Sequence, residues 1–593
     1  MCGIIGYKGM DNASEKILQC LKRLEYRGYD SWGIAIQADK IHVIKKTGKI
    51  SDISIKDLNL PESSVGIGHT RWATSGKPTD KNAHPFISVN NSFALAHNGI
   101  VENYEKLKNE LIKKGCIFES ETDTEVIVKL IEEESKSSLD FITAVKKAFK
   151  MLNGRNSIII LKNDSEIYAA RNGSPLVLGF RNLGIDKNNI YLSSDVLSFA
   201  PYVKKIIVID NNQLVHINND IKIYDLIFNK EINYKIEDLN INIGRVDKKG
   251  FDHFMIKEIH ENPYVIKQVI TQDKNDYIKL TEAIKNARNV YTIGSGTAGL
   301  AAAQIAYYLR VFGGIRAISL IGGEAREYFN FFNNNDIIIA PSQSGETADV
   351  LEVLEFAKSK GTKIASYVNM PGSAMSRISD FKFMANAGPE ICVMSTKIFV
   401  SQIAWGYLLA KTINSKFEEG KNNLELTINK LSDYLKNKKS MLIIRKIAKE
   451  LIKSRDIFIM GKSQNLQISN EGMIKIIEGT YKHAHSIPAG DLKHYAITLI
   501  EEGVPVIVLV SNDNVKTDIL NAVSEVKARG AKVIAIANEN NELYDYLIKV
   551  PESNETSSIM NVTSLQLLAY YMTLELGNNV DKPRNIAKSV TVK

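Results

Sequence analysis

The second half of the chain repeats one pattern, an apolar strand that runs into a polar loop, at a nearly constant spacing. The strands are predicted in pairs, 289–293 with 456–460, 336–340 with 505–510, and 363–368 with 532–537. The loop residues that match between the copies are Gly294 and Gly461, Ser342 and Ser511, and Asn369 and Asn538, which are 167, 169 and 169 residues apart. Because helical segments separate the strands, the pattern predicts two copies of one doubly wound, parallel-sheet α/β domain. Ligands of such sheets bind at the carboxyl ends of the strands, where all of these loops lie.

The rest of the chain divides into regions of different texture. Its 593 residues exceed the roughly 250–300 that one hydrophobic core supports. Up to about residue 225, short β-rich runs alternate with glycine-rich turns, which favours a layered α/β domain built on antiparallel sheets. A stretch rich in Asn, Lys, Glu and Asp follows and is typical of a linker. The predicted organisation is a first domain at 2–226, a linker at 227–247, two further domains at 248–425 and 426–580, and a tail at 581–593.

Composition argues against several kinds of site and partner. The four cysteines include no CxxC pair and the ten histidines include no HExxH motif, so we expect neither a disulfide framework nor a metal site. The net charge of +8 is spread along the chain, which argues against a nucleic-acid partner. The N-terminus lacks the apolar segment of a signal peptide, and no apolar run reaches the roughly 18–20 residues that span a bilayer. We therefore expect a cytoplasmic protein with no membrane partner.

Cys2 directly follows the initiator methionine. If Met1 is removed, one residue carries both a thiol and a free α-amine, whose ordinary pKa of about 7.7–8.0 lets it accept the thiol proton at neutral pH. The alternative is an inert cysteine packed near the N-terminus, and Cys2 by itself favours that alternative. The polar motifs farther along the chain reverse this preference.

Three of these motifs supply the partners that a thiol nucleophile needs. Arg71 offers a planar guanidinium that can grip a carboxylate with two hydrogen bonds. Asn98 and Gly99 follow an apolar strand, and an Asn amide with a closely approached backbone N–H is what an oxyanion hole requires. Asp123 lies in a polar turn where it would hold an ammonium group, or cap the helix that follows; both interpretations can hold together.

The strand at 336–340 runs into a hydroxyl-rich turn and then a helix at 348–358. A helix N-terminus presents unpaired N–H groups, and the hydroxyls of Ser342, Ser344 and Thr347 add donors around it. A plain serine cap is the alternative, but three hydroxyls together with Gln343 and Gly345 favour a phosphate site.

A second candidate site lies on a predicted helix at 470–482. Glu471, Lys475 and Glu478 are spaced to share one face of it, which is typical of a solvated salt-bridge stripe. The loop that follows brings His494 towards the same strand ends. A carboxylate that moves a proton between two carbons, with a histidine that opens the ring, would suffice for aldose–ketose isomerisation. The residues alone leave the two interpretations evenly balanced.

Five separated motifs in the first 125 residues resemble those of class II glutamine amidotransferases, which are N-terminal-nucleophile hydrolases of αββα fold. The motifs are Met1-Cys-Gly-Ile-Ile-Gly, Tyr26-Arg-Gly-Tyr-Asp-Ser, His69-Thr-Arg-Trp-Ala-Thr, Ala96-His-Asn-Gly and Glu121-Thr-Asp-Thr-Glu. The resemblance implies that Cys2 is the nucleophile and that Asn98 and Gly99 form the oxyanion hole. It implies that Arg71 and Asp123 bind the α-carboxylate and α-amine of glutamine, and that Trp72 helps to gate the passage of ammonia.

The second half resembles the paired, flavodoxin-like sugar-isomerase (SIS) domains of the glutamine–fructose-6-phosphate aminotransferase (isomerising) family. The motifs are Ser342-Gln-Ser-Gly-Glu-Thr, Asn386-Ala-Gly-Pro-Glu-Ile, Ser395-Thr-Lys, Glu471-Gly-x-x-Lys-x-x-Glu, Ala489-Gly-Asp-Leu-Lys-His and Asp581-Lys-Pro-Arg-Asn-Ile-Ala-Lys-Ser-Val-Thr-Val. The resemblance implies that L-glutamine and D-fructose 6-phosphate are converted to L-glutamate and D-glucosamine 6-phosphate. This reaction needs no cofactor and is the first step of amino-sugar synthesis.

The same resemblance assigns the residues of the sugar site. The residues implied to bind the sugar phosphate are Thr297, Ser342, Gln343, Ser344, Thr347, Val393 and Ser395. Glu478 is implied to be the isomerising base, with Lys475 beside it. His494 is implied to open the sugar ring from the partner subunit of a homodimer. Lys588 is implied to form a Schiff base with the sugar, from a tail that would otherwise be expected to fray.

Three other functions fit the motifs less well. A different class II amidotransferase would need a phosphoribosyl-binding or ATP-dependent half, and the sequence shows no such motif. A sugar-phosphate sensor would lack an intact set of Glu478, His494 and Lys588 and would usually carry a DNA-binding module. A deaminase that runs the chemistry backwards would have no use for Cys2.

Overall fold

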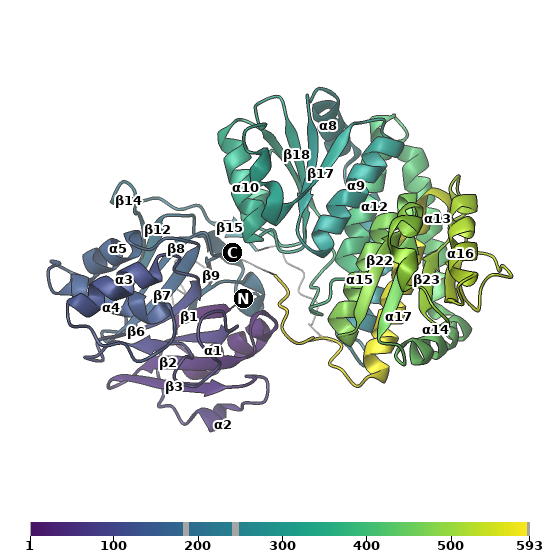
Figure 1. The fold of residues 1–593 in the computed structure, drawn as a ribbon. Coiled ribbons are helices and arrows are strands. Elements are labelled where there is room, and N and C mark those ends of the chain that lie inside the picture. Colours follow the sequence, from purple (N-terminus) through teal and green to yellow (C-terminus); the bar gives the residue numbers. More distant parts are fainter. Residues whose placement is uncertain (1, 182–188, 240–247, 590–593) are drawn as a thin grey trace. The chain divides into compact units, whose positions relative to one another are not determined.

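The computed structural model describes residues 2–181, 189–239 and 248–589. Met1, residues 240–247 of the predicted linker and residues 590–593 of the predicted tail lie outside the described residues. The chain forms two compact units, one with the N-terminal sheets and one with two parallel sheets (Figure 1). Among the described helices, none combines the length and the apolar character needed to cross a membrane.

Two antiparallel sheets form the centre of the N-terminal unit (Figure 1). The first has the order β15-β11-β9-β10-β1-β4-β2-β3 and the second the order β14-β13-β12-β8-β7-β6-β5. The strands of the first sheet are β1 (Gly3–Gly9), β2 (Ser31–Gln37), β3 (Ile41–Thr47), β4 (Val65–Arg71), β9 (Val177–Phe180), β10 (Asn189–Ser193), β11 (Lys205–Val208) and β15 (Glu237–Asp238). The strands of the second are β5 (Phe86–Ile87), β6 (Phe93–Gly99), β7 (Asn156–Lys162), β8 (Ile167–Asn172), β12 (Gln213–Ile217), β13 (Ile221–Asp225) and β14 (Lys230–Ile232).

The sheets pack face to face and helices cover their outer faces. Ile4 and Ile67 from the first sheet share an apolar core with Ala94 and Ile159 from the second. The helices are α1 (Ala13–Leu24) on the first sheet and α3 (Tyr104–Lys113), α4 (Thr124–Ser135) and α5 (Phe141–Lys150) on the second, with a short α2 (Ile55–Leu58). Helix α1 packs closely on β4 at Gly68, where an added Cβ would lie only 2.5 Å from the Ile17 side chain. The four layers confirm the predicted αββα fold.

The predicted linker at 227–247 carries regular structure in its described part. Strand β14 pairs with β13, and β15 pairs with β11, at the edges of the two sheets. Both strands are polar and largely exposed, so their composition resembles that of a linker even though their backbones pair. Residues 230–238 therefore belong to the N-terminal unit.

The second unit contains two five-stranded parallel sheets of one topology (Figure 1). Their orders, β17-β16-β18-β19-β20 and β22-β21-β23-β24-β25, both place the strands as 2-1-3-4-5, the flavodoxin-like order. The strands of the first are β16 (Val290–Gly294), β17 (Ala317–Ile321), β18 (Ile337–Ser342), β19 (Lys363–Val368) and β20 (Phe381–Met384). Those of the second are β21 (Asp456–Gly461), β22 (His483–Pro488), β23 (Pro505–Leu509), β24 (Lys532–Ala537) and β25 (Tyr546–Lys549). The predicted repeat of doubly wound domains is confirmed.

Helices cover both faces of these sheets. In β18, Ile337 and Ile339 face a core shared by the two sheets, whereas Ile338 and Ala340 face an outer core formed with α10. The helices are α6 (Phe254–His260), α7 (Asn262–Ile270), α8 (Lys274–Lys285), α9 (Thr297–Val311), α10 (Ala348–Ser359), α11 (Ala374–Ile378), α12 (Lys397–Ile413), α13 (Phe417–Lys436), α14 (Lys438–Leu451), α15 (Leu466–Thr480), α16 (Lys516–Lys527) and α17 (Ser557–Glu575). Helix α13 runs through the boundary predicted at 425/426, so a continuous helix occupies that point of the chain.

Candidate active sites

Cys2 lies immediately before β1, and the pairing of β1 with β4 sets its surroundings. Gly3 is opposite Thr70 in this register, which brings Cys2 beside Arg71 and Trp72. The backbone N–H of Trp72 donates to the Cys2 Sγ over 3.4 Å. Burial raises the pKa of the thiol, and the Trp72 hydrogen bond and the Arg71 guanidinium act in the opposite direction. A thiol in this environment requires a nearby base to become a thiolate at neutral pH.

Trp72 connects the nucleophile region to the motif at 26–31. Its ring meets the ring of Tyr29 edge-on, with centroids 5.6 Å apart. The next residue, Ala73, donates its backbone N–H to a carboxylate oxygen of Asp30 over 2.9 Å. These two contacts hold the turn after β4 in place above Cys2.

Strand β6 ends with Asn98 and Gly99, next to Cys2. The Asn98 Nδ2 donates to the carbonyl oxygen of Cys2 over 3.0 Å. Gly99 has a φ of +141°, and a Cβ there would lie 2.3 Å from the carbonyl oxygen of Arg155. Only glycine fits this position, because the obstructing atom belongs to the backbone beside β7. The structure thus brings both predicted oxyanion residues to the Cys2 end of β1.

Arg71 and Asp123 are held by neighbouring backbone. The Arg71 guanidinium donates to carbonyl oxygens of the loop 75–77, among them that of Gly76 at 3.1 Å. Asp123 occupies the N-cap position of α4, but its side chain does not cap the helix. It accepts instead from the backbone N–H of Val101 over 2.8 Å, two residues beyond Gly99. The predicted helix start is confirmed, while the carboxylate is directed towards the end of β6.

In the second unit, the predicted phosphate loop follows β18 as expected. Ser342 ends the strand, and its Oγ accepts from the backbone N–H of Gly345 over 2.9 Å, which tightens the turn before α10. Gln343, Ser344 and Thr347 occupy the same turn and are partly exposed. The predicted helix at 348–358 corresponds to α10, Ala348–Ser359.

The charged stripe on α15 is buried rather than solvated. Glu471 and Lys475 are 0% and 1% exposed, while Glu478 keeps part of its side chain in solvent. The Lys475 Nζ lies 2.5 Å from an oxygen of Glu478 and 3.5 Å from one of Glu471. Thr297, which opens α9, donates its hydroxyl to Glu471 over 3.2 Å. The solvated-stripe interpretation is therefore wrong for Glu471 and Lys475.

The two buried groups of this stripe, Glu471 and Lys475, both have a raised pKa, but for different reasons. Burial raises the pKa of Glu471 to about 7, so this carboxyl holds a proton over much of the range below neutrality. Burial disfavours the Lys475 cation, but the carboxylates of Glu471 and Glu478 outweigh it and raise the pKa of the lysine. Lys475 is consequently a fixed positive charge beside Glu478.

Lys588 lies in a second buried charge cluster. Its Nζ is 2.5 Å from an oxygen of Glu390 and 2.7 Å from the carbonyl oxygen of Cys392. The same Glu390 oxygen accepts from the Ser395 hydroxyl over 2.9 Å. Burial opposes the charged form of Glu390, but Lys588 lowers its pKa. Lys588 and Ser395, both predicted site residues, therefore meet at one carboxylate.

The tail that carries Lys588 is anchored along its length. Asp581 accepts from the backbone N–H groups of Phe254 and Met255 at the start of α6, over 3.0 and 2.9 Å. Its carbonyl oxygen accepts from Val393 over 3.0 Å. Arg584 donates its backbone N–H to the Tyr481 hydroxyl over 3.0 Å, next to the end of α15. The tail thus connects the Glu478 end of α15 with the 390–395 loop, and residues 581–589 do not fray.

A cavity of about 480 Å³ opens beside Glu478. Its lining residues come from the end of α15, from β22 and from the tail: Ile477, Glu478, Tyr481, Lys482, His483, Ala484, Arg584, Asn585 and Ile586. His494 does not reach this place within one chain. It is exposed on a short 3₁₀ turn, Ala489–His494, and no hydrogen bond or ion pair joins it to another described residue.

Comparisons with known proteins agree with this division of the chain. A model of the glutamine amidotransferase domain matches residues 69–200, and a model of the SIS domain matches residues 283–412 and again 450–576. A protein of Pyrococcus horikoshii named glutamine–fructose-6-phosphate aminotransferase (isomerizing) is 38% identical over 608 aligned residues, which cover 100% of both chains. A protein of the same name from Aquifex aeolicus is 38% identical over 604, again with complete coverage of both. This chain belongs to the glutamine–fructose-6-phosphate aminotransferase (isomerizing) family.

A solved structure supports the assignment of the second unit. The C-terminal domain of glucosamine-fructose-6-phosphate aminotransferase from Francisella tularensis aligns with a TM-score of 0.51 and 25% identity. The alignment covers 57% of this chain and 100% of that domain.

The sequence did not assign Glu258 or Glu390 to the site, and it predicted Glu471 only as part of the charged stripe on the helix. Glu471 and Glu390 each pair with a predicted site lysine. Glu258 accepts from the backbone N–H of Ile391 over 2.6 Å, and burial raises its pKa to about 8. Glu471 and Glu390 were visible within quoted motifs, but only burial distinguishes them from surface carboxylates. Glu258 lies in no motif, so its sequence gave no signal.

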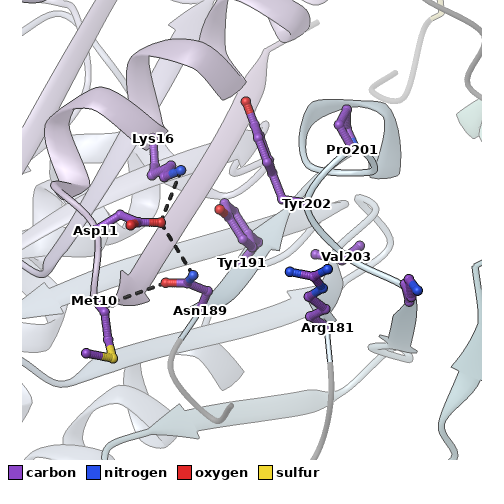
Figure 2. Close-up of a pocket in the computed structure, with 10 residues that line it drawn as sticks. Met10, Asp11, Lys16, Arg181, Asn189, Tyr191, Pro201, Tyr202 and Val203 are labelled. Atoms are coloured by element: carbon purple, nitrogen blue, oxygen red, sulfur yellow. Dashed lines mark hydrogen bonds and ion pairs between the residues drawn. The ribbon is translucent and has the colours of Figure 1, made fainter.

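A separate cavity of the N-terminal unit contains none of the predicted site residues (Figure 2). One side is closed by an ion pair between Lys16 and Asp11 at 3.1 Å, and by Asn189, which accepts from the backbone N–H of Met10 over 3.1 Å. Met10 and Asp11 directly follow β1 and Asn189 is opposite Gly9 at its end, whereas Cys2 precedes its start. At about 3.3 Å per residue, the length of β1 separates this cavity from Cys2.

Proposed function

We propose that the chain transfers the amide nitrogen of L-glutamine to D-fructose 6-phosphate and isomerises the product to D-glucosamine 6-phosphate, releasing L-glutamate. The observation that carries the proposal is the presence of two separate sites in a chain aligned over its whole length with aminotransferases of this name. One site surrounds the Cys2 thiol, and the other surrounds the buried lysines Lys475 and Lys588.

In the first site, the Cys2 thiolate attacks the side-chain amide carbon of glutamine. The α-amine of Cys2, once Met1 is removed, takes the thiol proton and returns it to the leaving ammonia. Asn98 Nδ2 and the Gly99 backbone N–H stabilise the oxyanion, where one such donor is typically worth about 10²–10³ in kcat. Water then cleaves the thioester and releases glutamate. Arg71 and Asp123 fix the α-carboxylate and α-amine of the substrate by opposite charge.

In the second site, the turn 342–347 at the start of α10 holds the sugar phosphate, with Thr297, Val393 and Ser395 near the sugar. Lys588 attacks C2 of the open-chain ketose, after giving its proton to Glu390, and loss of water leaves a Schiff base. Ammonia displaces the lysine from C2. Glu478 then moves a proton from C1 to C2 while the O1 hydroxyl loses its proton and the nitrogen gains one, which converts the 2-imino sugar into the 2-amino aldose. Lys475 stabilises the negative charge that develops next to it.

Ring opening requires a group that the single chain does not place at Glu478. We propose that His494 of a second copy supplies it, which makes the enzyme a homodimer. We also propose the domain limits 2–226 for the glutaminase domain and 248–425 and 426–580 for the two sugar-isomerase domains. Strands β14 and β15 extend the glutaminase domain beyond residue 226. A cytoplasmic location stays a prediction.

The test follows glutamate and amino sugar together in a reaction of purified protein with both substrates. Wild type should release the two products in equal amounts. Cys2→Ala should abolish synthesis from glutamine and keep part of the synthesis from concentrated ammonia, since the two chemistries use different units. Equal loss with both nitrogen donors would contradict the two-site proposal.

A further inference from the structure

Three histidines lie buried together beneath the Cys2 site. They are His69 in β4, His84 before β5 and His97 in β6, and they are 0%, 4% and 2% exposed. The rings of His69 and His84 stack with centroids 4.1 Å apart, and the rings of His84 and His97 are nearly parallel at 6.4 Å. The proposed chemistry uses none of them.

Hydrogen bonds fix the proton on each ring of the pair His84 and His97. The backbone N–H of His97 donates to His84 Nδ1 over 3.4 Å, so His84 carries its proton on Nε2. That proton is donated to the Thr124 hydroxyl oxygen over 3.3 Å. The Thr124 hydroxyl then donates to His97 Nδ1 over 2.9 Å. His97 is left with its proton on Nε2, which it donates to Asn156 Oδ1 over 2.9 Å.

The third ring joins the same network at the backbone. His69 Nε2 donates to the carbonyl oxygen of His97 over 2.9 Å. Burial lowers the pKa of His69 to about 3, and burial also lowers those of His84 and His97. All three rings are therefore neutral at physiological pH, which is the state that the directed hydrogen bonds require.

Two network members are the chain neighbours of proposed glutamine-site residues. His97 precedes Asn98, the side-chain oxyanion donor. Thr124 follows Asp123, the proposed ligand of the α-amine. The Thr124–His97 hydrogen bond thus joins the start of α4 to the end of β6, and it fixes the spacing between Asn98 and Asp123.

Two more members, His69 and Asn156, lie next to the remaining parts of the site. His69 lies two residues before Arg71 on β4, so their side chains leave the strand on the same face. Asn156 is directly opposite Gly99 in the β6–β7 pairing. Arg71, Asn98, Gly99 and Asp123 therefore each lie within two residues of a network member.

We propose that Thr124 and the three histidines are positioning residues, which hold the oxyanion donors and the glutamine-binding groups at their working spacing. This inference rests on the proposed glutaminase function. A network that only stabilised the fold would affect the melting temperature and leave turnover by the folded enzyme unchanged. A positioning network affects turnover in the folded enzyme, because a shift of about 1 Å in a catalytic group can cost about 10²-fold in rate.

The test compares Thr124→Val with Thr124→Ser. Valine keeps the shape of threonine and removes the hydroxyl that bridges His84 and His97, whereas serine keeps the hydroxyl. We expect Thr124→Val to lower kcat for glutamine hydrolysis about 10- to 100-fold. We expect Thr124→Ser to retain kcat within about threefold of wild type, since its hydroxyl makes the same two hydrogen bonds. Two readouts should stay unchanged in Thr124→Val, namely amino-sugar synthesis from concentrated ammonia and the rate of Cys2 alkylation by iodoacetamide, followed by peptide mass spectrometry.

A second variant breaks the same hydrogen bond from the other side. His97→Gln keeps a donor for Asn156 and removes the Nδ1 acceptor. The loss of kcat in His97→Gln should not add to the loss of kcat in Thr124→Val when both changes are combined in the double variant. The inference is overturned by normal kcat in folded Thr124→Val, by equal losses in the valine and serine variants, or by additive losses in the double variant. Failure of the proposed function itself would look different, since wild type would then release no glutamate from glutamine.

Discussion

Replacement of Gly99 by alanine tests the oxyanion hole most directly. Gly99 ends β6 with a φ of +141°, in register with Asn156 of β7. A Cβ at this position would lie 2.3 Å from the carbonyl oxygen of Arg155 and 2.9 Å from the Asn156 Cα. Both obstacles are backbone atoms in or next to an interior strand of the second sheet, so neither can turn away as a flexible side chain would.

Two costs follow from this geometry. Alanine at such a φ is strained by about 1–3 kcal/mol, and the clash must in addition push residue 99 away from β7. The second effect displaces the Gly99 backbone N–H from the oxyanion, and loss of one such donor typically costs about 10²–10³ in kcat. We expect glutamine hydrolysis by Gly99→Ala to fall by about 10²-fold or more, while amino-sugar synthesis from concentrated ammonia continues.

Gly115→Ala is the matched control, because Gly115 has a φ of +87° with no atom within 4 Å of its added Cβ. It carries the backbone strain of an alanine at positive φ without the clash or the proximity to Cys2. Steady-state release of glutamate and a thermal melt of each variant separate turnover from stability. If kcat of Gly99→Ala stays within about threefold of that of Gly115→Ala, the Gly99 N–H is not an oxyanion donor.

Three further predictions concern the second unit. Glu478→Gln keeps the shape of the side chain but removes its proton transfer, so amino-sugar formation should fall by about 10²–10⁴-fold while glutamine hydrolysis survives; unchanged formation would make Glu478 a bystander. Borohydride reduction with fructose 6-phosphate present, followed by peptide mapping, should place the sugar adduct on Lys588, and an adduct on Lys475 would refute that assignment. Glu471 has a folded pKa of about 7 against an ordinary 4.5, so its contribution to stability is complete below about pH 4.5 and is lost as pH rises through 7. The free energy of unfolding of wild type should therefore fall by up to about 3 kcal/mol relative to that of Glu471→Gln over this range, at about 1.4 kcal/mol per pKa unit. If the two proteins differ in melting temperature by the same amount at pH 4.5 and at pH 8, this prediction is wrong.

The sequence predicted the parallel sheets well because of how such strands are buried. Helices cover both faces of each sheet, so strands such as β18 and β23 are continuous apolar runs that end abruptly at polar loops. The predicted limits of β19 and β24 coincide with those in the structure for the same reason. The polar edge strands β14 and β15 were missed, because an edge strand exposed to water has the composition of a linker.

Burial of charge could not be predicted from spacing. The positions of Glu471, Lys475 and Glu478 fit an exposed salt-bridge stripe as well as a buried one, since helical spacing shows only that the residues share a face. In the structure the stripe is buried at Glu471 and Lys475, and Glu471 meets the hydroxyl of Thr297 at the start of α9. Thr297 lies 174 positions away from Glu471 in the chain, so the spacing on the helix gives no sign of this contact.

The order of the tail has the same origin. Residues 581–589 lack the periodicity of a helix or strand, and a terminus of this kind frays unless tertiary contacts hold it. Here a buried carboxylate supplies such a contact, because Glu390 would be costly to bury in the absence of the Lys588 charge. Asp581 contributes another by capping the start of α6. The ion pair with Glu390, the group proposed to take the proton that Lys588 must lose before it attacks the sugar, thus also orders the segment that carries the lysine, so removal of Glu390 should release the tail and the lysine together.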